Sequence, residues 1–239
     1  IKPEDIGGTK LGALGIPEFG TDFAMQMLMD TKPQYFSDLV RIAGLAHGTD
    51  VWLGNAQTLI KEGKATISTA ICTRDDIMIY LIQKGLDSEE SFKIMEMVRK
   101  GKVASGKCKE WPEWKQDMID HGVPDWYIWS CERIKYMFPK AHAAAYVMMA
   151  WRVAYCKVFY PLAYYTAYFS IRATAFDYEK MAMSPVRLEH YIAEYKAKKA
   201  EGTISNTEED ELGVMRIVQE MHARGYEFTP IDIYKAKAR

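Results

Sequence analysis

Apolar residues recur along most of the chain at three- and four-residue spacing, which is the period of an amphipathic helix. No run alternates apolar and polar positions well enough to predict a strand. Residues 7–20 interrupt the pattern with several glycines and Pro17, so we expect a loop there, and they lack the glycine–lysine spacing of a P-loop. The pattern predicts a mainly α, irregular multi-helix domain with a Gly-rich N-terminal loop and little or no sheet.

Capping residues mark where several of these helices begin and end. Thr21 and Ser37 are placed to cap the first two helices. Asp87 and Glu90 have the spacing of a capping box, and Gly225 is placed to stop the last helix. We expect residues 103–115 to form a loop, because a glycine and a proline break their periodicity. The expected helices span residues 19–30, 36–46, 73–83, 87–100, 124–137, 142–160, 161–172, 186–199 and 207–224.

The composition is that of an ordinary globular protein, since 49% of its 239 residues are hydrophobic and 26% are charged, and the length allows one large domain or two small ones. The four cysteines form no C-x-x-C pair, so we interpret them as reduced thiols of a cytoplasmic protein. Residues 141–171 are the most apolar stretch, but charged residues and a proline interrupt them, which predicts buried helices rather than a membrane span. The sequence shows no signal peptide, and we expect both ends to continue in a longer protein.

The net charge of −1 hides an uneven distribution of charge along the chain. Residues 1–90 carry an excess of acidic side chains, whereas basic side chains far outnumber acidic ones in residues 93–109 and 130–176. Residues 177–239 are slightly acidic again. Cations gathered in the middle of the chain suit a polyanion such as phosphate. The alternative is that they lie on solvated helix faces or complement the C-terminal ends of helices.

Residues 136–146 are the most informative segment, because they place chemistry at the start of a long Ala-rich helix. Lys140 and His142 lie just before or within the first turn, where unpaired amides and the helix dipole favour anions. Tyr146 follows His142 by four residues and therefore shares its helix face, from which it could stack on a base or sugar. The alternative is that His142 is a satisfied polar residue and that Tyr146 belongs to the core.

Several blocks of sequence carry a resemblance to a known family. One is Lys140-Ala-His-Ala-Ala-Ala-Tyr146, followed by Lys157-x-x-Tyr-Pro161. The others lie in residues 11–21, 36–55 and 72–102, and the last two contain His-Gly-Thr-Asp-Val-Trp and Arg-Asp-Asp-Ile-Met. Together they resemble the fingers region of bacterial replicative DNA polymerase III alpha subunits, of the PolC type found in Gram-positive bacteria. The resemblance runs in one order from about residue 8 to about residue 234.

The resemblance implies a nucleotide- and template-binding part of a DNA-directed DNA polymerase. In that family the fingers close over the incoming dNTP, while metal ions on a separate palm promote phosphoryl transfer. Basic residues of the fingers would hold the triphosphate or template phosphates, and other polar residues would line the pocket near the nascent base pair. The substrate-binding candidates are Arg74, Arg99, Lys102, Lys140, His142, Tyr146, His47, Thr49 and Asp50.

Two of the basic candidates have simpler explanations that the sequence leaves open. Arg74 is next to Asp75 and Asp76 and could pair with one of them. Arg99 lies near the end of an expected helix and could serve only to complement that end.

We expect no catalytic residue and no metal ligand in this chain. Asp75-Asp76 is the only Asp-Asp pair and opens an expected helix, so we do not assign it to the metal-binding aspartates of the palm. The family's helix-hairpin-helix, exonuclease and PHP regions have no recognisable counterpart here. No cofactor is therefore expected in this fragment, Mg²⁺ is expected on the missing palm, and the fragment alone is not expected to polymerise.

The resemblance divides the chain into a fingers core, residues 1–176, and a helical C-terminal part, residues 177–239, which would lead to a missing downstream DNA-binding region. Residues 103–117 match the family poorly. The expected partners are template and primer DNA, dNTP, and the palm and other domains of the parent polymerase, with no membrane. The competing hypotheses are a non-catalytic helical nucleic-acid-binding module and a helical scaffold domain with solvated charges.

Overall fold

The structure is a computed structural model that describes residues 1–235. Within these residues the chain forms twelve α-helices and no strand, and the only backbone bridge is an isolated one between Thr49 and Tyr136. The predicted mainly α fold is therefore confirmed. The chain divides into two compact units: a central unit, Pro17–Trp151, and a terminal unit built from Ile1–Ile16 and Arg152–Arg239.

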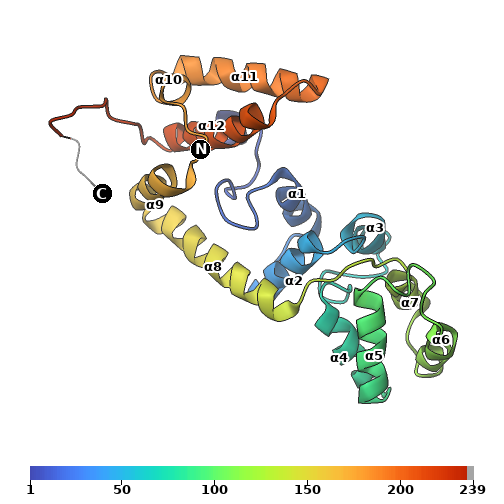
Figure 1. Cartoon of the computed structure of the whole chain (residues 1–239). Coiled ribbons are helices and arrows are strands. Elements are labelled where there is room, and N and C mark those ends of the chain that lie inside the picture. Colours follow the sequence, from blue (N-terminus) through green and yellow to red (C-terminus); the bar gives the residue numbers. More distant parts are fainter. Residues whose placement is uncertain (236–239) are drawn as a thin grey trace. The chain divides into compact units, whose positions relative to one another are not determined.

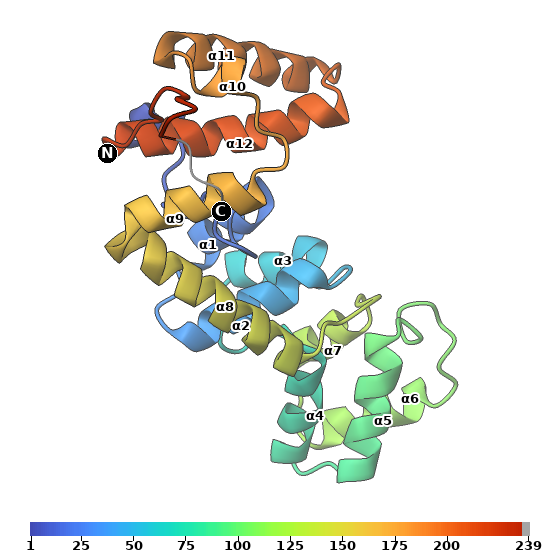
Figure 2. The same cartoon turned by 60° about the vertical axis from the view of Figure 1, so that its left-hand side comes forward.

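The central unit packs its helices around a continuous set of buried aliphatic and methionine side chains. Helices α4 and α5 lie side by side in both views (Figures 1 and 2). Fully buried side chains include Ile42 of α2, Ile77 of α4 and Ile94 of α5. The helices lying wholly within this unit are α1 (Asp22–Thr31), α2 (Phe36–His47), α3 (Gln57–Lys61), α4 (Arg74–Gln83), α5 (Ser88–Arg99), α6 (Trp111–Asp120) and α7 (Asp125–Cys131), with a short kinked turn of non-helical backbone, η2 (Trp52–Ala56), before α3.

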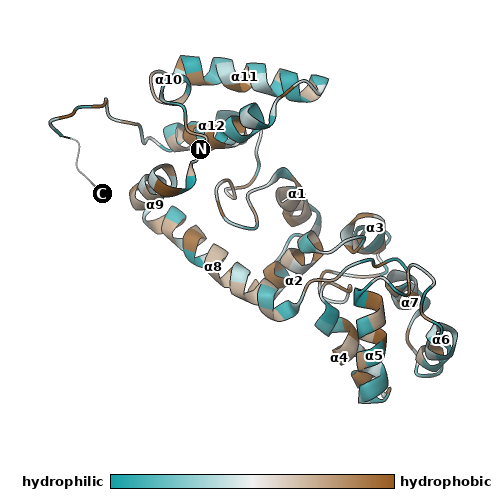
Figure 3. Ribbon diagram, viewed as in Figure 1, coloured by the Kyte–Doolittle hydropathy of each residue, from teal (hydrophilic) through white to brown (hydrophobic). Residues whose placement is uncertain are grey.

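The terminal unit is organised around α12, which packs against both α11 and the short N-terminal turn η1 (Pro3–Ile6). Helix α12 accordingly buries residues on more than one side, among them Met215 and Ile217. Hydrophilic residues dominate the surface of α11, as expected of a helix that buries a single face (Figure 3). The elements are α9 (Pro161–Ala167), η3 (Tyr168–Arg172), α10 (Tyr178–Met181), α11 (Pro185–Glu201) and α12 (Asn206–Ala223).

Helix α8 (Lys140–Phe159) begins in the central unit and ends in the terminal unit. It covers the Ala-rich stretch that the sequence predicted as its strongest helix. Although α8 is long, none of the described helices is both long and apolar enough to cross a lipid bilayer. The units divide the chain at residues 16/17 and 151/152. The functional roles assigned to residues 1–176 and 177–239 stay predictions.

Of the four predicted caps, Thr21, Asp87 and Gly225 are confirmed and Ser37 is wrong. The Thr21 hydroxyl accepts a hydrogen bond from the Ala24 amide, and the Asp87 carboxylate accepts from two amides at the start of α5. Ser37, by contrast, lies inside α2. There the neighbouring Asp38 carboxylate accepts from the backbone amides just before the helix. Because α2 begins at Phe36, Ser37 is already a helical residue and cannot act as its N-cap.

The structure differs from the predicted elements mainly around residues 103–137. The predicted loop over residues 103–115 contains the start of α6, whose proline, Pro112, occupies the first turn where its missing amide costs nothing. Helix α7 ends at Cys131, short of the predicted end at Met137. The residues after α7 instead form an extended connection to α8, and this connection organises the candidate site.

Candidate functional site

Residues 135–140, here called the hub segment, connect α7 to the first residue of α8. On one side the hub segment pairs with the turn after α2. The Thr49 amide donates to the Tyr136 carbonyl at 2.9 Å, and the Lys135 amide donates to the Thr49 carbonyl at 3.1 Å. The Lys135 ammonium also lies 2.8 Å from the Asp50 carboxylate. The predicted pocket residues Thr49 and Asp50 are therefore held against the hub segment.

The ends of α4 and α5 also bond to the hub segment through their backbones. The Met137 amide donates to the Arg99 carbonyl, and the Arg74 amide donates to the Phe138 carbonyl, both at 3.3 Å. Three sequence blocks that the candidates were drawn from thus meet at one connection. Because these hydrogen bonds use only backbone atoms, they hold Arg74 and Arg99 beside the hub segment without engaging their side chains.

Gly101 explains how the turn after α5 comes so close to the hub segment. Its φ is +67°, and a Cβ at this position would lie 2.6 Å from the Lys135 carbonyl oxygen. A residue with a side chain would therefore meet both backbone strain and a clash. Lys102 follows this contact directly and is exposed.

The start of α8 is held by the two aspartates of α4. The Asp75 carboxylate accepts a hydrogen bond from the Lys140 amide at 2.9 Å, and Asp76 lies 3.5 Å from the Lys140 ammonium. A carboxylate at a helix N-terminus stabilises the helix by about 0.3–1 kcal/mol. The sequence predicted that first-turn amides would be free to attract an external anion. In the structure, the protein's own carboxylate already takes one of them.

Lys140 also lines a cavity of about 330 Å³ in the central unit. Arg41 of α2 lines the same cavity, so two cations from different helices face one space. Hydroxyl groups and aromatic rings complete the wall. The lining residues are Arg41, Ser68, Thr69, Ala70, Asp76, Ile79, Tyr80, Gln83, Trp126, Tyr127 and Lys140.

Arg41 is held in place by Asp38, which lies 3.2 Å away one turn earlier on α2. Burial acts to raise the pKa of Asp38, but hydrogen bonds from the Gln34 and Tyr35 amides and the Arg41 guanidinium outweigh it and lower that pKa below its ordinary value. Asp38 is therefore ionised at neutral pH and fixes the guanidinium that faces the cavity.

Both histidine candidates contact one aromatic ring in the hub segment. The Phe138 ring centroid is 4.7 Å from that of His47 and 6.0 Å from that of His142. His47 also pairs with the Glu18 carboxylate. The structure therefore brings His47 and His142 to the same ring, although they are distant in sequence.

The side chains of Arg99 and Arg74 both have carboxylate partners. Arg99 forms a two-pronged ion pair with Glu96, and its hydrogen bond, against the effect of burial, lowers the pKa of Glu96 to about 2. Arg74 lies 3.9 Å from Asp75, as the simpler explanation from the sequence expected. These pairs are local, and both arginine side chains are partly exposed. Their proposed contacts with phosphate stay predictions.

Lys102 and Tyr146 are connected less directly with this group. Among the contacts of residues 1–235, no side-chain interaction joins either of them to the hub segment. Tyr146 is 45% exposed on α8, one turn after His142. It is therefore not a core residue, which was the alternative that the sequence left open.

Sequence reasoning missed Arg41 and Phe138. Arg41 lies in one of the blocks that carry the resemblance. However, it follows Asp38 by three residues on an expected helix, and this spacing indicates only a local ion pair between the two. Phe138 is an aromatic residue in the short connection between the expected helices over residues 124–137 and 142–160. Neither position carries a local pattern that would reveal its tertiary neighbours.

The paired aspartates have no geometry suited to a catalytic metal in this chain. Asp75 accepts from the Lys140 amide, and Asp76 accepts from the amides of Cys72 and Thr73. Across residues 1–235, no three His, Cys, Asp or Glu side chains gather in a way that could hold a metal ion. The residues present therefore do not fit the Mg²⁺ expected for the reaction, and its assignment to a separate palm stays a prediction.

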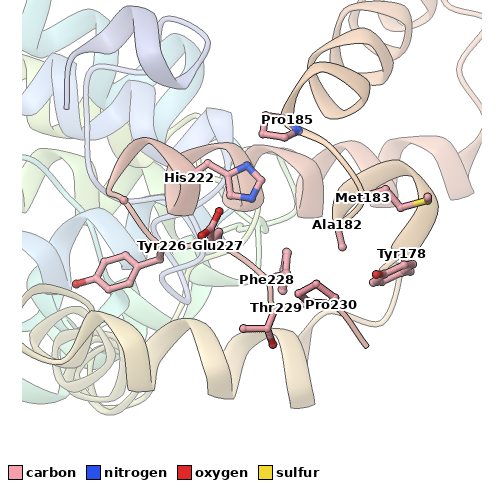
Figure 4. A pocket seen from close by; sticks show the side chains of 11 residues that line it. Tyr178, Ala182, Met183, Pro185, His222, Tyr226, Glu227, Phe228, Thr229 and Pro230 are labelled. Atoms are coloured by element: carbon pink, nitrogen blue, oxygen red, sulfur yellow. The ribbon is translucent and has the colours of Figure 1, made fainter. Parts of the chain in front are cut away.

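One cation of the basic block at residues 130–176 is not available to a polyanion. Lys157 is 4% exposed and pairs with the buried Glu220 in the terminal unit. A second cavity, of about 540 Å³, lies elsewhere in this unit beside His222 and Phe228 (Figure 4). None of the residues predicted from the sequence lines it.

Comparison with known proteins agrees with the resemblance seen in the sequence. Residues 9–122 match the family model for the bacterial DNA polymerase III alpha subunit finger domain. The chain is 54% identical over 238 residues to the PolC-type DNA polymerase III of Streptococcus suis, and 51% identical over 238 residues to that of Caldanaerobacter subterraneus. It is 52% identical over 235 residues to that of Bacillus subtilis.

These matches cover nearly the whole chain, 98–100% of it, but only 16% of each relative. The identity extends beyond residue 122, so the likeness to PolC-type polymerases includes α8 and the terminal unit as well. The resemblance predicted from the sequence is confirmed.

Proposed function

We propose, from the premise that residues 9–122 belong to the bacterial DNA polymerase III alpha subunit finger domain family, that this chain supplies the fingers of a PolC-type replicative DNA polymerase. In this role it binds the triphosphate of the incoming dNTP at the start of α8 and the template and primer beside it. The parent protein is a DNA-directed DNA polymerase. The palm, with its Mg²⁺, and the other domains lie in the remaining parts of the parent chain.

The observation that carries this proposal is the shared cavity of Arg41 and Lys140. Two cations reach it from different helices, and hydroxyls of Ser68 and Thr69 line the same wall. Charge-assisted hydrogen bonds to phosphate oxygens are about twice as strong as neutral ones. The volume of about 330 Å³ accommodates a phosphate chain together with part of a nucleoside.

The carboxylate pairs at this cavity do not prevent anion binding. The Lys140 ammonium is 3.5 Å from Asp76, and its side chain is 43% exposed. Ion pairs this exposed contribute only about 0–1 kcal/mol. A triphosphate carries several negative charges and therefore displaces Asp76 as the main partner of Lys140.

The other candidates are assigned to the nucleotide and template around this cavity. His142 and Tyr146 occupy successive turns on one face of α8, where they contact the base or sugar of the nascent pair. Arg74, Arg99 and Lys102 contact triphosphate or template phosphates. His47, Thr49 and Asp50 shape the pocket wall from the other side of the hub segment. A replicative polymerase works on chromosomal DNA, which supports a cytoplasmic location.

Nucleotide binding by the chain itself tests the proposal. Amide chemical shifts are followed by NMR while dNTP and Mg²⁺ are added to the wild-type chain and to Lys140→Ala and Arg41→Ala variants. The loss of one charge-assisted hydrogen bond costs about 1.5–3 kcal/mol, so each variant should bind roughly ten- to a hundredfold more weakly. Lys61→Ala is the matched control, because Lys61 is an exposed lysine of α3 outside the cavity lining.

The pattern of shifts distinguishes the competing hypotheses. Shifts on adding dNTP that cluster around Arg41, Arg74 and Lys140 support the proposal. Shifts that appear only on adding DNA would favour a non-catalytic nucleic-acid-binding module. Equal affinity of all three lysine and arginine variants for dNTP would remove the cavity from the proposed site.

A further inference from the structure

Lys157 is a buried lysine whose ammonium group is fully occupied by partners within the terminal unit. It donates to the carbonyl oxygens of Gly12 and Leu14, the first at 2.9 Å, and lies 2.8 Å from a carboxylate oxygen of Glu220. The side chains of Lys157 and Glu220 are only 4% and 1% exposed. An ammonium has three N–H groups, so these three acceptors satisfy it completely.

The partners of this pair are fixed in turn by neighbouring helices. The Tyr165 hydroxyl of α9 donates to Glu220 at 2.6 Å. Arg224 donates to that hydroxyl at 3.2 Å and to the backbone carbonyl of Lys157 at 3.0 Å. Burial lowers the pKa of Lys157, while Glu220 acts in the opposite direction. The network joins α8, α9 and α12 to the N-terminal loop.

The loop that Lys157 holds is also closely packed. At Gly15, where φ is +70°, a Cβ would lie 2.2 Å from the Tyr164 hydroxyl and 3.2 Å from a methyl carbon of Ile217. The Tyr164 hydroxyl itself donates to the Leu14 carbonyl at 3.5 Å. Residues 12–15 are therefore confined by α9 and α12 as well as by Lys157.

The position of this network along the chain is what gives it a functional meaning. The chain passes between the two units twice, after Ile16 and after Trp151. Gly12 and Leu14 lie just before the first passage, and Lys157 lies shortly after the second, on α8. A single ammonium thus ties together the two segments through which the terminal unit is connected to the central unit.

We propose that Lys157 and Glu220 form a clamp that fixes residues 12–14 and the end of α8 within the terminal unit, and that nucleotide incorporation by the parent polymerase depends on this clamp. Lys157 is a positioning residue, since it lies in the terminal unit and acts through the backbone of residues 12–14 and α8. A buried ion pair suits this role because its directional hydrogen bonds specify one arrangement of the loop. The catalytic part of this inference rests on the proposed function, whereas the clamping of the loop does not.

The test uses the double variant Lys157→Met/Glu220→Gln, which removes both charges and leaves an acceptor for the Tyr165 hydroxyl. Native-state hydrogen exchange is measured for the amides of residues 12–16 in the chain. We expect exchange there to become about tenfold faster or more, because two carbonyl oxygens of the loop lose their donor. The control is Lys198→Met/Glu208→Gln, an ion pair at 2.6 Å on the surface of the same unit, which should leave this exchange unchanged.

The same variants in the intact parent polymerase test the positioning role. We expect the double variant to lower kcat for dNTP incorporation at least several-fold while KM for dNTP stays within about twofold, because the cavity of Arg41 and Lys140 lies wholly in the central unit. A structural role alone would lower the fraction of active enzyme, which active-site titration corrects for.

Each outcome bears on the proposal. Unchanged loop exchange in the folded double variant overturns the clamp, and faster exchange with unchanged kcat overturns the positioning role. If the wild-type chain failed to bind dNTP at the Arg41–Lys140 cavity, the proposed function would fail, while the exchange result would still decide the clamp.

Discussion

Replacing Lys157 by methionine is the perturbation whose effect follows most directly from the structure. Methionine fills a similar volume but cannot donate, so the variant leaves the carbonyls of Gly12 and Leu14 without the lysine donor and leaves the Glu220 carboxylate with only the Tyr165 hydroxyl. The carboxylate is almost wholly shielded from water, and solvent cannot replace the lost partner. The change therefore leaves a buried charge without its countercharge, in addition to removing two hydrogen bonds to the loop.

The expected magnitude comes from this burial. Removing one partner of a buried ion pair typically costs about 3–5 kcal/mol. For a chain of this length, about 1 kcal/mol shifts the melting temperature by roughly 2–4 °C, so the variant should melt roughly 6–20 °C lower. Adding Glu220→Gln removes the stranded charge, so the double variant should lose only about 1–2 kcal/mol.

The assay is urea unfolding of the wild-type chain, both single variants and the double variant, followed by circular dichroism. The four free energies form a double-mutant cycle, which gives the interaction between the two side chains directly. The exposed pair Lys198–Glu208 provides a parallel cycle, for which we expect little coupling. A Lys157→Met cost below about 1 kcal/mol, or a double variant as unstable as the single one, would refute the reasoning.

Three further predictions concern the central unit. Gly101→Ala should destabilise the chain by more than about 1 kcal/mol, because φ is +67° and the new Cβ would meet the Lys135 carbonyl at 2.6 Å; thermal melting measures this, and an unchanged midpoint would contradict it. Glu96 has its pKa lowered to about 2 by its hydrogen bond from Arg99, so its contribution of ~1 kcal/mol is present above its ordinary pKa of about 4.5 and is lost as pH falls toward 2. Glu96→Gln should abolish this part of the acid dependence in unfolding curves recorded between pH 2 and 6, and identical curves would argue against the ion pair. In the intact parent enzyme, Lys140→Ala should lower kcat/KM for dNTP roughly ten- to a hundredfold, and a wild-type value would remove Lys140 from the site.

Local patterns were enough to predict much of the fold. The start of α5 at Asp87 was predicted correctly, because a cap and its partners lie within a few residues of one another. The same local logic failed at α2, because the helix begins at Phe36, before Ser37, and Asp38 accepts from the amides just before the helix. It also failed at Pro112, since proline breaks a helix in its interior and is tolerated in its first turn.

The candidate site could be predicted only in part. Lys140 was expected at a helix start and lies there, with His142 in the first turn. The resemblance placed Thr49, Arg74 and Arg99 near one pocket, and backbone bonds connect all three to the hub segment. Their roles in binding remain predictions, and Arg41, the second cation of the cavity, carried no signal in the sequence.

By itself, the sequence determined the helical class, most of the helix positions and the resemblance to a family, because periodicity, caps and motifs are properties of neighbouring residues. Only the tertiary structure decided which charged side chains are available to bind an anion. Lys157 counted as one more cation in a basic block, but its partners Gly12 and Glu220 are 145 and 63 positions away and bury it. The Asp75 carboxylate, 65 positions away, accepts the hydrogen bond of the Lys140 amide at the start of α8. No local pattern reports such contacts, because burial and pairing depend on which distant segments fold against each other.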